Sequence, residues 1–167
     1  MQPLVALLMG SQSDLPKIQG ALDVLKDFGV PHTVRVMSAH RTPGTVAEFA
    51  GGAAASGLKV MIAAAGGAAH LAGVVAAHTT LPVIGIPVEG GALNGLDALL
   101  ATVQMPGGIA VATVGVGSGG ATNAGLLAVQ MLALTDTGLA AKLDAFRRKQ
   151  QEKVARADAE LQAALGG

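Results

Sequence analysis

The hydrophobic residues of this 167-residue chain fall into short runs, and each run is followed by a segment with helical features. The apolar runs, which we predict to be strands, are residues 4–9, 32–37, 59–65, 82–88 and 108–116. The segments that we predict to be helices are residues 15–28, 43–56, 68–78, 94–102 and 120–134. The strand runs are continuous rather than alternating, which is typical of strands buried on both faces of a parallel sheet.

Strands that alternate with helices predict an α/β fold. We expect a doubly wound, flavodoxin-like parallel sheet of five strands in the order 2-1-3-4-5, inside a three-layer α/β/α arrangement. Residues 139–165 form one further segment, a charged amphipathic helix. We therefore expect a flavodoxin-like domain over residues 1–138 and an extra C-terminal helix over 139–167. That helix packs either on its own subunit or, as we favour, on a neighbouring one.

The composition argues against several classes of protein. Hydrophobic residues make up 51% of the chain and the mean hydropathy is +0.53, but no apolar run reaches the ~20 residues of a membrane helix. The first residues lack a basic leader, so we expect a cytoplasmic protein that does not bind a membrane. A formal net charge of zero does not indicate nucleic-acid binding. The chain has no cysteine, which excludes disulfides, thiolate ligands and a cysteine nucleophile.

The charged residues are distributed unevenly. Ten of the 22 lie between Lys142 and Glu160, so the rest of the chain has only twelve with which to solvate its surface. Contiguous apolar surface usually marks an interface. We therefore expect a homo-oligomer.

Polar residues gather in three loops that follow the first three predicted strands. These loops are "GSQSD" (10–14), "SAHRTP" (38–43) and "AGGAAH" (65–70). In a doubly wound sheet, ligands bind beyond the carboxyl ends of the strands, where the strand order reverses. The order 2-1-3 makes these three strand ends neighbours, so we expect one crevice to collect all three loops.

The first two loops carry groups that suit a nucleotide. Ser11, Ser13 and the free amides of a helix N-terminus can bind a phosphate, and Asp14 can either cap that helix or accept hydrogen bonds from ribose hydroxyls. An ordinary helix cap is the alternative for this loop. Arg41 can clamp a phosphate with two hydrogen bonds. Its neighbour His40 carries an imidazole that titrates near neutral pH and can move a proton.

The remaining histidines divide into one candidate and two structural residues. The glycines of the third loop allow close approach of a flat ligand, and His70 either joins that site or bonds to a loop carbonyl. We interpret His32 and His78 as structural. No group of histidines and carboxylates has convincing spacing for a metal, so we predict no metal site.

Taken together, these motifs resemble those of the PurE family of purine biosynthesis. The resemblance runs from about residue 4 to 150, through "MGSQSD", "SAHRTP", "AGGAAHL", "GIPV", "ALNGLDALLATVQMPGG" and "TNAGLLAVQML". It implies a flavodoxin-like subunit in a homo-octamer that acts on a small nucleotide without a metal or organic cofactor. The implied reaction interconverts N5-carboxyaminoimidazole ribonucleotide and 4-carboxy-5-aminoimidazole ribonucleotide, with carbon dioxide released, trapped and recaptured.

The resemblance also implies a role for each motif. Phosphate binding falls on Ser11, Ser38 and Arg41, ribose contact falls on Asp14, and Ser13 lines the same loop. His40 becomes the general acid and base. The residues implied to enclose the aminoimidazole are Gly66, Gly67, Ala68, His70 and Leu71.

The chain departs from the family pattern at a few positions. Three other functions also stay open: a carboxylase that uses free carbon dioxide, an electron carrier and a noncatalytic nucleotide-binding protein. The family often has different residues at Ala64, Ala72, Gly90 and Gly91, and the last two lie in a loop that borders the expected site. Arg41 resembles the mutase branch, whereas carboxylases that use free carbon dioxide commonly carry lysine there. A flavodoxin-like electron carrier is possible for the fold, but the chain lacks Trp and Tyr to stack on a flavin. The third function is that of a noncatalytic nucleotide-binding protein.

Overall fold

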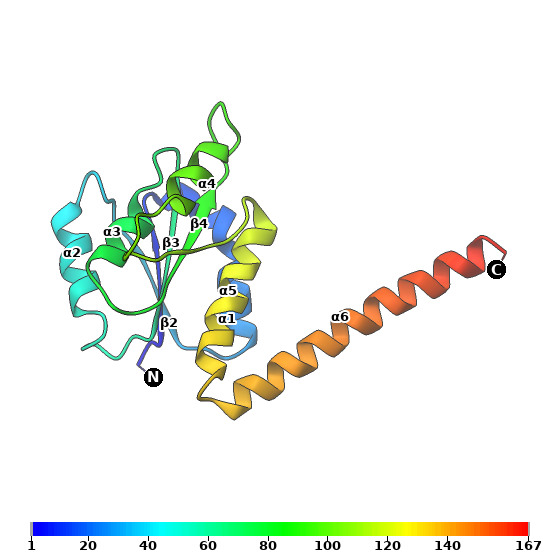
Figure 1. Cartoon of the computed structure of the whole chain (residues 1–167). Helices are drawn as coiled ribbons and strands as arrows, with labels where there is room; N and C mark the ends of the chain where they lie inside the picture. The colour runs from blue at the N-terminus through cyan, green and yellow to red at the C-terminus, as the bar shows by residue number, and fades with distance from the viewer. Residues whose placement is uncertain (1, 167) are drawn as a thin grey trace. The chain divides into compact units, whose positions relative to one another are not determined.

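A five-stranded parallel sheet in the order β2-β1-β3-β4-β5 forms the centre of the structure, a computed structural model that describes residues 2–166 (Figure 1). Its strands are β1 (Val5–Met9), β2 (His32–Val36), β3 (Val60–Gly66), β4 (Val83–Val88) and β5 (Ala112–Thr113). Every residue of β1 and β4 is buried, as continuous apolar runs predict. The predicted α/β class and strand order are confirmed.

The register of the first three strands brings their carboxyl ends together. Met9, the last residue of β1, lies opposite Val36 in β2 and opposite Ala64 in β3. The loops that follow these strands therefore start side by side. This is the strand-order reversal at which a ligand site is expected.

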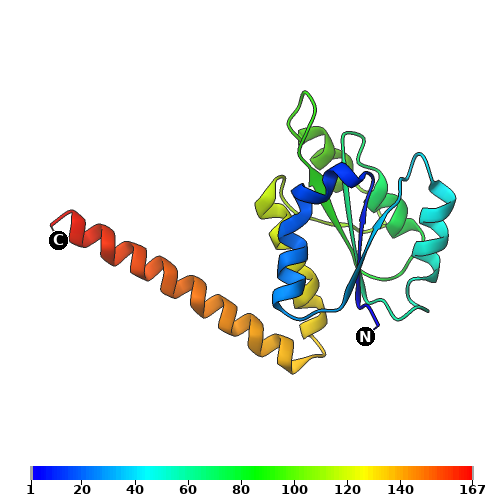
Figure 2. The ribbon, with the colours of Figure 1, turned by 180° about the vertical axis from the view of Figure 1, so that it is seen from behind.

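Two layers of helices enclose the sheet, as predicted. One face is covered by α2 (Pro43–Gly52), α3 (Leu71–Ala77) and α4 (Leu96–Val103), and the other by α1 (Gln19–Asp27) and α5 (Ser118–Ala133) (Figures 1 and 2). The core on the first face joins side chains such as Leu8 and Met61 of the sheet to Val46 of α2 and Val75 of α3.

Glycines allow α1 and α5 to approach each other closely on the second face. A Cβ atom at Gly125 would lie 2.8 Å from the carbonyl oxygen of Ala21 and 2.9 Å from the Cβ of Val24. A Cβ at Gly20 would lie 2.6 Å from the hydroxyl of Thr122. A larger residue at Gly125 would therefore require the backbone to move, and one at Gly20 would require the Thr122 side chain to turn away.

Several element boundaries differ from the predicted ones for local reasons. The expected helix over 15–28 is divided into a 3₁₀ helix η1 (Gln12–Ile18) and α1, because Pro16 lies inside the first part and has no N–H to donate. The helix α4 begins at Leu96 rather than 94, because Asn94 and Gly95 have φ angles of 50° and 90°.

The predicted fifth strand is much shorter than expected. We predicted residues 108–116, but β5 contains only Ala112 and Thr113, which pair with Ile84 and Gly85 of β4. It is an edge strand that pairs with β4 alone, and Gly117, with a φ of 86°, lies in the bend that leads into α5. The helices α2 and α3 are also shorter than predicted, since α2 ends at Gly52 and α3 begins at Leu71.

The last part of the chain is a second unit, from Leu132 on, whereas the sheet belongs to the unit that ends at Met131. The helix α6 (Thr137–Ala164) is begun by Asp136, whose carboxylate accepts a hydrogen bond from the N–H of Leu139 at 3.0 Å. The expected functional division at residues 138 and 139 stays a prediction. None of the helices in residues 2–166 combines the length and the apolar character needed to cross a bilayer.

Candidate functional site

A cavity of about 250 Å³ lies where the first three strands end. Its walls come from the three loops that the sequence singled out. The lining residues are Gly10, Ser11, Asp14, Ser38, Ala39, His40, Arg41, Ala65, Gly66, Ala68, His70 and Leu71. The topology thus collects the polar loops into one site, as the strand order requires.

Nine of the eleven residues predicted for the site line this cavity. The remaining two, Ser13 and Gly67, lie in the same loops but are not among its lining residues. Gly10, which belongs to the loop predicted to suit a phosphate, also lines the cavity, together with Ala39 and Ala65, to which sequence reasoning gave no individual role. These three offer only backbone groups and small apolar surface, so their side chains give no chemical signal.

The first loop is organised by its two serines. Ser11 is the N-cap of η1, and its Oγ accepts a hydrogen bond from the N–H of Ser13 at 3.3 Å. The hydroxyls of Ser11 and Ser13 are themselves 2.8 Å apart. Ser13 therefore braces Ser11, which faces the cavity at the start of the helix. Asp14, in the first helical turn, adds a carboxylate to the same wall.

The second loop is a tight turn built around Ser38. The Ser38 Oγ accepts hydrogen bonds from the backbone N–H groups of His40 and Arg41, at 3.3 and 3.1 Å. Thr42 closes the turn, because its N–H donates to the carbonyl oxygen of Ser38 at 2.9 Å. A hydroxyl has two acceptor positions and one hydrogen, so Ser38 can hold the turn and still donate its O–H to a ligand.

Arg41 links the second loop to the first. Its Nη2 donates a hydrogen bond to the carbonyl oxygen of Gly10 at 2.8 Å. This contact directs the guanidinium toward the loop that carries Ser11. Hydroxyls, a helix start and a guanidinium on adjacent loops form a suitable set of donors for a phosphate.

The third loop brings a second histidine to the first. Gly67 has a φ of 61°, and the chain then passes through Ala68 and the buried Ala69 to His70 at the start of α3. The Nε2 of His40 lies 2.7 Å from the Nδ1 of His70, and the two rings meet edge to face with centroids 4.9 Å apart. The sequence placed both residues in one crevice but did not indicate this contact.

The other two histidines make local contacts, which supports their structural interpretation. The Nδ1 of His32 lies 2.9 Å from the carbonyl oxygen of Val30, and that of His78 lies 2.8 Å from the carbonyl oxygen of Val74. Within residues 2–166, no three His, Cys, Asp or Glu side chains gather as a metal site would require. The charged groups lining the cavity are Asp14 and Arg41.

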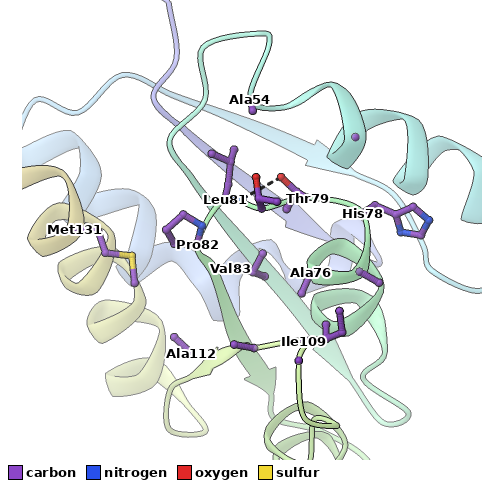
Figure 3. A pocket seen from close by; sticks show the side chains of 15 residues that line it. Ala54, Ala76, His78, Thr79, Leu81, Pro82, Val83, Ile109, Ala112 and Met131 are labelled. Atoms are coloured by element: carbon purple, nitrogen blue, oxygen red, sulfur yellow. Dashed lines mark hydrogen bonds between the residues drawn. The ribbon is translucent and has the colours of Figure 1, made fainter.

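A larger cavity of about 850 Å³ lies at the opposite end of the sheet, where β4 begins (Figure 3). Its walls are largely apolar or small, with Leu81, Val83, Ile109 and Met131 among the larger side chains. It lacks the charged side chains and paired imidazoles of the smaller cavity. Size alone would favour this cavity as a binding site, but the chemistry favours the smaller one.

The loop after β4, which contains the unusual Gly90 and Gly91, is attached to η1. The Lys17 ammonium donates a hydrogen bond to the carbonyl oxygen of Glu89 at 2.6 Å. Neither glycine lines the smaller cavity. The loop therefore borders the first loop through Lys17.

Comparison with known proteins gives a consistent result. The model of the AIR carboxylase family matches residues 4–153. Proteins named N5-carboxyaminoimidazole ribonucleotide mutase are similar to this chain. The protein of Bacillus subtilis is 54% identical over 92% of this chain and 95% of its own length. The protein of Mycobacterium tuberculosis is 54% identical over 99% of this chain and 94% of its own length. The crystal structure of Treponema denticola PurE covers 96% of the chain and 99% of its own, at 30% identity and a TM-score of 0.86.

Proposed function

Because the chain belongs to the AIR carboxylase family, we propose that it interconverts N5-carboxyaminoimidazole ribonucleotide and 4-carboxy-5-aminoimidazole ribonucleotide. One observation carries the chemical part of the proposal. His40 and Arg41 are consecutive residues that line one cavity together with Ser11 and Asp14. An anchor for a phosphate thus lies next to a group that can take and return a proton.

The reaction requires one proton to change place. The substrate carries its carboxyl group on the exocyclic nitrogen, and loss of carbon dioxide requires a proton on that nitrogen. The ring carbon then attacks carbon dioxide, forms the new carbon–carbon bond and releases its own proton. A group that donates a proton to the exocyclic nitrogen and later accepts the proton of the ring carbon balances both steps. We assign this role to His40.

The cavity wall supports the assignment of the remaining parts of the nucleotide. Ser11, Ser38 and Arg41 bind the phosphate, and Asp14 accepts hydrogen bonds from the ribose. The third loop, with Gly66, Ala68, His70 and Leu71 on the cavity wall, encloses the ring. Ser13 supports this site through its bond to Ser11, and Gly67 supplies the turn that shapes the third loop.

Apolar groups near His40 suit the trapped intermediate. Ala39, Ala65, Ala68 and Leu71 line the cavity together with His40. Carbon dioxide is uncharged and forms only weak hydrogen bonds. It therefore loses little free energy when it leaves water for an apolar wall. Excluding water keeps it beside the ring carbon until it is recaptured.

A turnover assay with labelled carbon tests this function against the carboxylase alternative. The protein is incubated with N5-carboxyaminoimidazole ribonucleotide in ¹³C-labelled bicarbonate, and the product is analysed by mass spectrometry. The proposed reaction gives an unlabelled product because the trapped carbon dioxide is reused. Label in the product would instead support a carboxylase that takes free carbon dioxide, and absence of conversion would support a noncatalytic nucleotide-binding protein.

We also propose that the protein works as a homo-oligomer, with the octamer of the PurE family as the expected size. Exposed apolar residues on α4 support this, since Leu96, Leu100 and Val103 recur at helical spacing and are each about half exposed, at 51%, 48% and 51%. Leu93, just before the helix, is 58% exposed. Light scattering at micromolar concentration tests the proposal, and a monomer mass would contradict it. A cofactor-free reaction and a cytoplasmic location stay predictions.

A further inference from the structure

We propose that His70 is a positioning residue that acts with His40 as one proton-sharing pair. The inference rests on the proposed function and goes beyond it, because it assigns to His70 a task other than enclosing the ring. It starts from the 2.7 Å separation between His40 Nε2 and His70 Nδ1. That distance is within the range of a hydrogen bond.

A bond between these two nitrogens restricts the protonation of both rings. A neutral imidazole has one N–H donor and one acceptor nitrogen, whereas a charged imidazolium has two donors. One hydrogen lies between Nε2 of His40 and Nδ1 of His70, so one of the two must accept. Two imidazolium rings would direct two N–H groups at each other. The intact pair therefore holds one positive charge at most.

The same bond couples the protonation of the two outer nitrogens of the neutral pair, which are Nδ1 of His40 and Nε2 of His70. If His40 donates through Nε2, its Nδ1 is a base and the Nε2 of His70 carries a proton. If His70 donates through Nδ1, the Nδ1 of His40 carries the proton and the Nε2 of His70 is the base. The tautomer of His40 thus depends on that of His70, because the hydrogen bond that one ring nitrogen makes determines whether the other nitrogen carries the proton.

This coupling suits a reaction that needs an acid first and a base afterwards. When the pair is charged, the outer N–H of His40 donates its proton to the exocyclic nitrogen of the substrate, and the pair becomes neutral. The ring carbon later returns one proton, and the pair becomes charged again. Each step moves one proton, and the shared hydrogen lets the charge rest on either ring.

The surroundings limit which charges act on the pair. The other charged groups lining the cavity are the Asp14 carboxylate and the Arg41 guanidinium, and the guanidinium is bonded to the Gly10 carbonyl. His70 is the N-cap of α3, and the residues of that helix, Leu71–Ala77, are all uncharged. Asp14 and Arg41 carry opposite charges, so their effects on the charge of the pair oppose each other.

Proton NMR of the unliganded, full-length protein tests the pair without any turnover. The Cε1–H signals of His40 and His70 are followed against pH in the wild type and in His70→Asn. Because one hydrogen lies between the two rings, we expect their signals to change together with pH in the wild type. In His70→Asn, which lacks the second imidazole, the curve of His40 should differ from that of the wild type. An identical His40 titration curve in both proteins would overturn the proposal.

Kinetics provide a second, independent test. His70→Asn should lower kcat by about 10–10²-fold, less than the 10²–10⁴-fold typical of losing the general acid or base, while KM changes little. His70→Gln, whose amide can still bond to His40 but cannot take up a proton, should recover part of the loss. The matched control is His78→Asn, which alters a histidine at the far end of α3 and should leave kcat unchanged. A rise in KM alone would mean that His70 only binds the ring, and would contradict a role in proton sharing.

Discussion

Arg41 and Gly10 connect the second loop of the site to the first, through a hydrogen bond of 2.8 Å from Nη2 to the carbonyl oxygen. A guanidinium has five N–H donors in a planar fork, and this bond uses only one of them. The contact orients the guanidinium before a ligand binds, so less conformational freedom is lost on binding. This orientation suits Arg41 to the role of phosphate anchor that we propose for it.

Replacing Arg41 with Leu should raise the KM for the nucleotide. A hydrogen bond to a charged group contributes roughly 1.5–3 kcal/mol, which corresponds to about 10- to 150-fold. Steady-state kinetics measure the change. The matched control is Arg35→Leu, because Arg35 lies on β2 against the Phe49 ring, 5.5 Å from its centroid, and does not line the cavity. Equal KM values for the two variants would mean that the phosphate is bound by residues other than Arg41.

Replacing Ser38 with Ala should loosen the turn that carries His40 and Arg41. The substitution removes the oxygen that accepts both of their N–H groups, at 3.3 and 3.1 Å. We expect a loss of about 1 kcal/mol in the free energy of unfolding, a lower kcat and a higher KM. Urea denaturation and kinetics measure these effects. Ser56→Ala removes a hydroxyl that bonds to the Ala53 carbonyl away from the site, and it should leave the kinetics unaltered.

Two glycines of α5 should respond in opposite ways to substitution by alanine. Gly125→Ala should destabilise the fold by about 1–3 kcal/mol, because the new methyl would lie 2.8 Å from the Ala21 carbonyl oxygen. Gly119 is the second residue of α5 and has no atom within 4 Å of an added Cβ, so Gly119→Ala should stabilise the fold by less than the gain of about 0.5–1 kcal/mol expected in the middle of a helix. Urea denaturation at one fixed protein concentration compares them, and equal stabilities would contradict the close packing of α1 and α5.

The sequence predicted which loops meet at one cavity better than it predicted the secondary-structure boundaries. The strands are indicated by continuous apolar runs, and these runs can be recognised even where Pro16 divides a helix or where only two residues of a predicted strand pair. Once the order is known, the three loops must meet. The positions of His40, Arg41 and Ser11 followed from that topology, together with the family motifs.

Features that depend on backbone groups or on distance could not be predicted. Nothing in the residue types indicates that the Gly10 carbonyl accepts a bond from Arg41, because every residue has such a carbonyl. The contact between His40 and His70 depends on rotamers and on the exact path of a loop that passes through Gly67 at positive φ. A 30-residue separation in sequence carries no information about a separation of 2.7 Å.

The helix α6 should contribute to assembly if it packs on a neighbouring subunit, as we propose. Leu161 is 55% exposed, and Val154, seven residues earlier on the same face, is 69% exposed. Leu161→Glu should therefore reduce the mass measured by light scattering or shift assembly to higher concentration. Ala163→Glu, which adds the same charge on a different face of the helix, is the control. An unaltered mass for Leu161→Glu would favour packing of the helix on its own subunit.

The most direct test of the central claim compares His40→Asn with the wild type, by calorimetric binding of the nucleotide and by the absorbance change of the imidazole during turnover. Asparagine keeps a similar shape and some hydrogen bonding, but it cannot take up a proton at neutral pH. We predict that the variant binds the nucleotide nearly as well as the wild type while turnover falls by about 10²–10⁴-fold. Turnover close to that of the wild type would contradict the account, because His40 could then not be the acid and base of the reaction.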